Sequence, residues 1–138
     1  TFVRKKQPGQ RRGPAPQAGG GWVKYHCLGT TDLTVSALGL GTVELGMPYG
    51  LGALSPPPDA DCIYLLHWAL DHGIGYFDTA AGYGRSEELL GKAFANRAGR
   101  PVIATKATIH RPGDGELLQG KALASHLENS VLRTRLLQ

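Results

Sequence analysis

The order of apolar runs and helical patterns across residues 74–109 constrains the fold of this chain more than any other feature. Residues 74–78 form a short apolar run that predicts a β-strand, and residues 101–109 form a second one. Between these runs, residues 86–99 carry apolar side chains at helical spacing and end in a glycine. A helix between two apolar strands is typical of parallel strands joined by a crossover connection.

Further strands and a loop are predicted toward the amino terminus. Residues 23–28 and 33–38 are strand-like runs on either side of the turn residues 29–32, which predicts a β-hairpin. A further strand is expected over residues 38–43, where glycines allow another backbone or a ligand to approach closely. Residues 44–58, rich in Gly and Pro, are predicted to form a loop.

Three helices are predicted from their end signals and apolar spacing. Asp59 or Asp61 is expected to cap or charge the start of the first helix, which ends at His72 and Gly73. Ser86 is expected to cap the second helix. The third helix is predicted from the apolar stripe of Leu123, Leu127 and Val131.

Alternating strands and helices predict an α/β fold with a parallel sheet and right-handed crossovers. Two architectures compete: an open doubly wound sheet and the first part of a (β/α)8 barrel. The open sheet predicts a dinucleotide-binding fingerprint after the first strand, but Glu44 stands where the third glycine after Gly39 and Gly41 belongs. We therefore favour a partial (β/α)8 TIM barrel, made of the hairpin and about three β/α units.

The barrel hypothesis places reactive side chains at the carboxyl ends of the strands. Period-two alternation puts Asp78 at the end of one strand and Lys106 toward the end of the next, each in phase with one face of its strand. An ion pair between Asp78 and Lys106 would offset the cost of burying either charge. We expect Tyr83, which lies between two glycines, to reach the same end, where a cation favours release of the phenol proton.

The net charge of +4 comes from one end of the chain. Residues 1–22 hold five of the fifteen Lys and Arg and none of the eleven Asp and Glu, so residues 23–138 hold ten basic and eleven acidic residues. We predict that residues 1–22, rich in Gly and Pro, form a disordered basic tail. The near-neutral remainder gives no indication of a nucleic-acid partner.

The cysteines, the histidines and the hydropathy of the chain indicate its location and exclude some kinds of partner. Cys27 and Cys62 are too few for a disulfide framework, which favours a reducing, cytoplasmic location. His67 and His72 are five residues apart and do not share a helical face, so no metal site is expected. No apolar run approaches the roughly 20 residues needed to span a bilayer, so no membrane partner is expected.

Three segments of residues 23–138, in this order, resemble the N-terminal part of the aldo/keto reductase superfamily. The most specific is Phe77-Asp-Thr-Ala-x-x-Tyr-Gly-x-Ser-Glu-x-x-Leu-Gly91. The others are Tyr25-x-x-Leu-Gly, which leads into Leu33-x-Val-Ser-x-Leu-Gly-Leu-Gly-Thr42, and Ile103-Ala-Thr-Lys106. The resemblance implies a (β/α)8 barrel whose bottom the hairpin covers.

The resemblance also implies an NADPH-dependent oxidoreductase, with NADH as the alternative cofactor, that reduces an aldehyde or ketone to an alcohol. Asp78, Tyr83 and Lys106 match three of the four residues of the family's catalytic tetrad. Tyr83 would protonate the carbonyl oxygen, Lys106 would promote that transfer, and Asp78 would hold Lys106. The cofactor-binding positions would be Gly41, Thr42, Val43 and Asp78, although many members have Trp where Val43 stands.

Two parts of the family pattern would lie beyond Gln138: the fourth catalytic residue, a histidine, and the segment that binds the 2′-phosphate. The resemblance therefore implies a truncated N-terminal piece of a reductase, inactive by itself, whose partner is a small-molecule carbonyl substrate. A reductase-like regulatory or binding subunit without turnover is one alternative. A gene remnant with no stable product is another, and no pattern specifies an oligomeric state.

Overall fold

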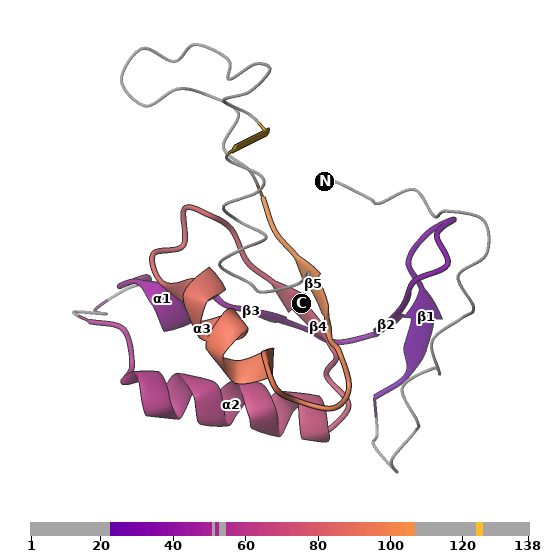
Figure 1. Ribbon diagram of the computed structural model, residues 1–138, viewed down its shortest axis with the longest axis horizontal. Coiled ribbons are helices and arrows are strands. Elements are labelled where there is room, and N and C mark those ends of the chain that lie inside the picture. Colours follow the sequence, from indigo (N-terminus) through magenta and orange to yellow (C-terminus); the bar gives the residue numbers. More distant parts are fainter. Residues whose placement is uncertain (1–22, 51, 53–54, 107–123, 126–138) are drawn as a thin grey trace.

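The computed structural model describes residues 23–50, 52, 55–106 and 124–125. These residues form a two-stranded antiparallel hairpin and a separate three-stranded parallel sheet whose strands follow chain order (Figure 1). The hairpin strands are β1 (Tyr25–Cys27) and β2 (Thr34–Ser36), and the sheet strands are β3 (Gly39–Gly41), β4 (Tyr76–Asp78) and β5 (Val102–Ala104).

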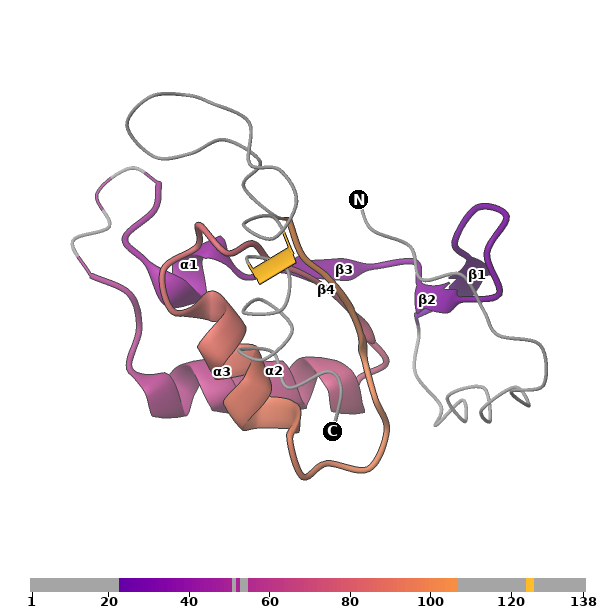
Figure 2. The same ribbon diagram turned by 45° about the horizontal axis from the view of Figure 1, so that its top comes forward.

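Two helices connect the parallel strands, and a short third helix follows β3. They are α1 (Val43–Gly46), α2 (Asp59–Asp71) and α3 (Ser86–Phe94). In Figures 1 and 2, α2 and α3 lie side by side on the same side of the sheet. Right-handed crossovers between strands that follow one another without reversal place successive helices on one face, as in the opening units of a (β/α)8 barrel.

The hairpin packs at the amino-terminal end of the parallel sheet. The Tyr25 hydroxyl donates to the Gly73 carbonyl oxygen at 2.8 Å, and the Gly75 amide donates to Ser36 Oγ at 2.9 Å. Both glycines precede β4, so these bonds attach the hairpin to the start of that strand. The predicted position of the hairpin at the bottom of the sheet matches this arrangement, and the opposite end holds the carboxyl termini of the strands.

The hydrophobic core lies between the sheet and its helices. Phe77 of β4 is fully buried, and Leu66 of α2 and Leu90 of α3 are also fully buried. Because side chains alternate along a strand, Tyr76 and Asp78 project from the opposite face to Phe77. The remaining buried members of this core are Leu45, Cys62, Ala69, Leu89 and Ala93.

Neither predicted capping residue caps its helix, although Asp59 and Asp61 do place negative charge in the first turn of α2, as the alternative expected. Helix α2 starts after Pro58, and Asp59 makes no cap hydrogen bond because its carboxylate binds Arg85 instead. Ser86 is the first residue inside α3 rather than its cap, and its hydroxyl donates to the carbonyl oxygen of Thr42. In each case the side chain that would have capped the helix is hydrogen-bonded to a residue outside that helix, Arg85 or Thr42.

Two further predictions differ from the structure or lie outside it. The predicted loop over residues 44–58 and the strand over residues 38–43 both overlap α1, where the chain leaves β3 and forms one helical turn. The basic tail, residues 1–22, lies outside the described residues. So does the third predicted helix, apart from Ala124 and Ser125, which are helical.

Candidate active site

The three residues predicted to be reactive meet at the carboxyl edge of the parallel sheet. Asp78 is the last residue of β4 and lies in register with Ala104, the last residue of β5. Lys106 follows two positions later, so alternation returns its side chain to the same face as Ala104. Tyr83 comes from the loop between β4 and α3.

The ammonium group of Lys106 has three oxygen acceptors. Its Nζ lies 2.5 Å from Asp78 Oδ1, 3.2 Å from the Thr79 carbonyl oxygen and 3.4 Å from the Tyr83 hydroxyl. An ammonium group has three donors, so these contacts use its full capacity. The structure therefore brings Asp78, Tyr83 and Lys106 together around a single nitrogen atom.

The charge of Lys106 is stabilised at this edge. Desolvation lowers its pKa, but the hydrogen bonds that Nζ donates to Asp78 and then to Tyr83, with the electrostatic attraction of these groups, outweigh desolvation and raise that pKa above the ordinary value. Lys106 Nζ also lies 5.0 Å from the centroid of the Tyr83 ring, within the range of a cation–π contact. A permanent cation beside a phenol favours transfer of the phenol proton to an acceptor.

Thr42 ties the end of β3 to Asp78. Its backbone amide and its Oγ1 both donate to the Asp78 carbonyl oxygen at 3.0 Å, and the residue is fully buried. The side chain of this predicted cofactor-binding residue therefore supports Asp78 rather than facing outward. Its neighbours differ, since Gly41 is exposed and Val43 is half-buried at the start of α1.

The edge beside Asp78 is open near the end of β3. Among the residues that the structure describes, no atom lies within 4 Å of a Cβ placed on Gly41. Asp78 and Lys106 keep side-chain exposures of 40% and 53% at the same edge. The described residues therefore leave room at this edge for the predicted cofactor.

The position of the Tyr83 loop depends on a close backbone contact with α1, which was not predicted. The Arg85 amide donates to the Gly46 carbonyl oxygen at 3.1 Å, and Gly84 has φ of +54° at this contact. A Cβ atom on Gly46 would overlap the Tyr83 carbonyl oxygen and the amide of Ser86. Gly46 and Gly84 can be read from the sequence, but their contact depends on α1, which lies within the stretch that the sequence predicts as strand and loop.

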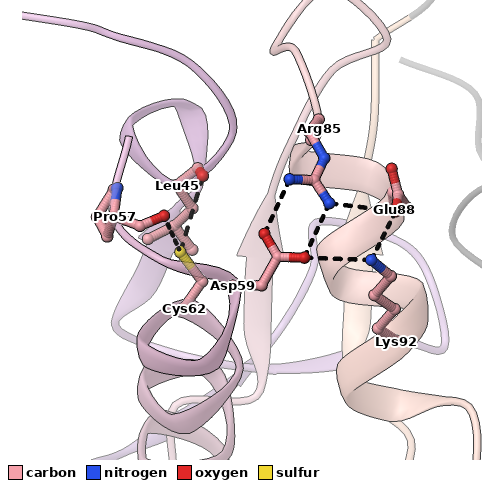
Figure 3. Close-up of polar contacts among 7 residues, drawn as sticks. All are labelled: Leu45, Pro57, Asp59, Cys62, Arg85, Glu88 and Lys92. Atoms are coloured by element: carbon pink, nitrogen blue, oxygen red, sulfur yellow. Dashed lines mark hydrogen bonds and ion pairs between the residues drawn. The ribbon is translucent and has the colours of Figure 1, made fainter. Parts of the chain in front are cut away.

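Arg85, in the loop beside Tyr83, is held by an ionic network. Its guanidinium group donates to both carboxylate oxygens of Asp59, at 2.9 and 2.8 Å, and to Glu88 at 3.4 Å (Figure 3). Lys92 completes the network, at 2.7 Å from Glu88 and 3.2 Å from Asp59. Arg85 lowers the pKa of Asp59 most, followed by Lys92, while Lys92 and then Arg85 lower the pKa of Glu88.

Cys62 of α2 is buried. Its Sγ lies 3.7 Å from the Pro57 carbonyl oxygen and 3.8 Å from that of Leu45 (Figure 3). Burial raises the pKa of this thiol, and the nearby carboxylates of Asp59 and Asp61 raise it further. A buried thiol with a raised pKa is a packing group rather than a nucleophile.

Metal-binding and membrane-spanning features are absent from the described residues. Within that part of the chain, no group of three or more His, Cys, Asp or Glu side chains is arranged to hold a metal ion. None of its helices combines the length and apolar character needed to cross a bilayer.

Comparisons with known proteins identify related chains. A sequence model of the aldo/keto reductase family matches residues 37–134. Pyridoxal 4-dehydrogenase of Microbacterium luteolum is 49% identical over 81 residues, which are 57% of this chain and 22% of that protein. L-galactose dehydrogenase of Arabidopsis thaliana is 34% identical over 96 residues, 66% of this chain and 28% of that protein.

The fold has solved counterparts as well. A Pseudomonas aeruginosa protein named as an aldo-keto reductase matches with a TM-score of 0.65 and 36% identity, over 80% of this chain and 43% of its own. The chain spans about a quarter of the length of the two curated relatives and less than half of the solved structure.

Proposed function

Because this chain belongs to the aldo/keto reductase family, we propose that it forms part of the active site of an NADP(H)-dependent oxidoreductase that reduces aldehydes and ketones to alcohols. The supporting observation is the position of Lys106 Nζ, 2.5 Å from Asp78 Oδ1 and 3.4 Å from the Tyr83 hydroxyl. A phenol, a cation and a carboxylate in contact are the groups needed to protonate a carbonyl oxygen.

Each of the three residues has a distinct role in this proposal. Tyr83 donates its proton to the carbonyl oxygen of the substrate as the alcohol forms. Lys106, charged at neutral pH, stabilises the negative charge left on the Tyr83 oxygen. Asp78 keeps the ammonium group in place, and the buried Thr42 keeps Asp78 in place through its carbonyl oxygen.

Nicotinamide, when bound, would supply a hydride to the carbonyl carbon. The residues that would hold it are Gly41, Val43 and Asp78 at the open end of β3 and β4. The buried Thr42 would support Asp78 through its two hydrogen bonds to the Asp78 carbonyl oxygen. NADPH is the proposed cofactor and NADH the alternative. The proposed setting is cytoplasmic, where the free thiols of Cys27 and Cys62 stay reduced.

The described strands form one side of a barrel rim, so we also propose that turnover needs the remaining strands found in the family. The 138 residues alone are then expected to show no carbonyl-dependent oxidation of NADPH. Turnover by these residues alone would contradict that expectation.

Replacing Tyr83 by Phe in the full-length gene product tests the proposed role of the phenol. The variant should lose about 100- to 10,000-fold in kcat for aldehyde reduction, the usual contribution of general acid catalysis. Tyr64→Phe is the matched control, because Tyr64 lies on α2 with 70% of its surface exposed. Near-normal turnover by Tyr83→Phe would overturn the assignment of the acid. A full-length protein that captures a stable protein partner and turns over no carbonyl would instead be a binding or regulatory subunit.

A further inference from the structure

We propose that Glu87 is a positioning residue that holds Lys106 within reach of Tyr83 by binding Thr105. This inference rests on the proposed function. Glu87 lies in the first turn of α3 and is 1% exposed. The Thr105 hydroxyl donates to Glu87 Oε1 at 2.6 Å.

The burial of Glu87 is not explained by the needs of its helix. An acidic residue in a first turn interacts well with the helix dipole while it is exposed, and Glu88 already lies there on the exposed side. Placing a carboxylate in the interior is unfavourable unless it is hydrogen-bonded. The Thr105 hydroxyl is one partner of this carboxylate, and it belongs to the segment that carries Lys106.

The position of Thr105 allows the contact to act on Lys106. Neighbouring residues of an extended segment project to opposite faces, so Thr105 faces the helix layer while Lys106 faces the other way. The backbone pairing weakens here: the Thr79 amide lies 2.8 Å from the Ala104 carbonyl oxygen, but the Ala81 amide lies 3.3 Å from that of Lys106. The Thr105 hydroxyl bond thus adds a short side-chain contact where the backbone bond is long.

Glu87 also belongs to the corner that carries Tyr83. The Ser86 amide donates to the Tyr83 carbonyl oxygen at 3.0 Å, so the loop and the start of α3 form one unit. Glu87 consequently joins the segment with the acid to the segment with the cation. The contact between Lys106 Nζ and the Tyr83 hydroxyl is 3.4 Å, at the long end for a hydrogen bond, so a small displacement would break it.

Four substitutions test the proposal in the full-length protein. Thr105→Val and Glu87→Ala remove the bond, Thr105→Ser keeps it, and Glu87→Asp keeps the charge but shortens the reach. The first two should lower kcat about 10- to 100-fold with a smaller change in KM, the scale expected for misplaced catalytic groups. Thr105→Ser should restore kcat, and Glu87→Asp should give an intermediate kcat.

A second measurement does not depend on turnover. NMR titration of the Lys106 ammonium group should show a lower pKa in Thr105→Val than in the unaltered protein, since hydrogen bonds now raise that pKa. Glu88→Gln is the control, because it removes an exposed charge from the same turn without touching Thr105. If Thr105→Val does not fold, Glu87→Asp carries the same test.

The outcomes separate this inference from the proposed function. An unchanged Lys106 titration and an unchanged kcat in folded Thr105→Val or Glu87→Asp would show that the bond is only structural, and would overturn the inference. A shifted Lys106 titration in a protein without carbonyl turnover would support the positioning of Lys106 by Glu87 and overturn the proposed reductase activity alone.

Discussion

Lys106 places one ammonium group among oxygen atoms of Asp78, Thr79 and Tyr83, and all three acceptors come from β4 and the loop that follows it. The geometry of these acceptors depends on residues that take no part in the chemistry. Gly46 is the clearest example, because the absence of a side chain there lets α1 touch the backbone of the Tyr83 loop.

Gly46→Ala should therefore harm both stability and activity. The new methyl group would overlap backbone atoms of Tyr83 and Ser86, and overpacking of this kind costs about 1–3 kcal/mol of the free energy of unfolding. We expect the displaced loop to lower kcat about 10- to 100-fold. Urea denaturation and steady-state kinetics measure the two effects. Gly82→Ala, in the same loop but with no atom within 4 Å of the added Cβ, is the matched control and should change little.

At the scale of elements, α2 and α3 are joined on their outer side by Asp59, Arg85, Glu88 and Lys92 (Figure 3). Arg85 also belongs to the loop that carries Tyr83, so the network connects α2 to that loop. Its side chains are between 39% and 53% exposed, which limits its contribution because water and salt screen the charges.

Asp59→Asn should lower the stability of the protein in a pH-dependent way. The pKa of Asp59 lies below its ordinary value of 3.8, so its ionised form stabilises the fold at neutral pH. That stabilisation is lost as the pH falls below about 4 and the carboxylate takes up a proton. Asp59→Asn should thus melt at a lower temperature than Asp61→Asn at pH 7, and the gap should close near pH 2.

The comparison with Asp61→Asn isolates the ionic network. Both substitutions remove an acidic residue from the first turn of α2, so the loss of the interaction with the helix dipole is shared. High salt should also reduce the gap at pH 7. Equal melting temperatures for the two variants at neutral pH and low salt would mean that the network contributes nothing measurable.

At the scale of the whole molecule, one core holds the helices against the sheet, and the candidate site lies on the other face of that sheet. Leu66, Phe77 and Leu90 meet in this core from α2, β4 and α3. The two helices and the central strand should therefore unfold together, because each loses its buried surface when either of the others leaves.

Leu66→Ala should lower the free energy of unfolding by about 2–5 kcal/mol, the range for deleting a fully buried leucine. Leu65→Ala, one residue earlier on α2 and 39% exposed, should cost clearly less. Urea denaturation followed by circular dichroism measures both. Similar losses for the two variants would contradict the placement of the core between α2 and the sheet.

The local sequence pattern was enough to predict the order of the strands and helices. Apolar periodicity and glycines identified the hairpin, the two main helices and the parallel strands, because these signals act over a few neighbouring residues. It also identified Asp78, Tyr83 and Lys106 as residues that would meet, because the carboxyl ends of adjacent parallel strands lie at one edge. Their catalytic roles stay a prediction.

Tertiary structure decided how the groups at that edge are supported. The pairing of Arg85 with Asp59 spans 26 positions, and that of Thr105 with Glu87 spans 18. Asp59 and Ser86 were expected to cap their helices, and both bind partners from other elements instead. Such contacts depend on which segments become neighbours in space. A pattern over a few neighbouring residues does not specify which segments those are. Packing of α1 and α2 against α3 brings these partners together.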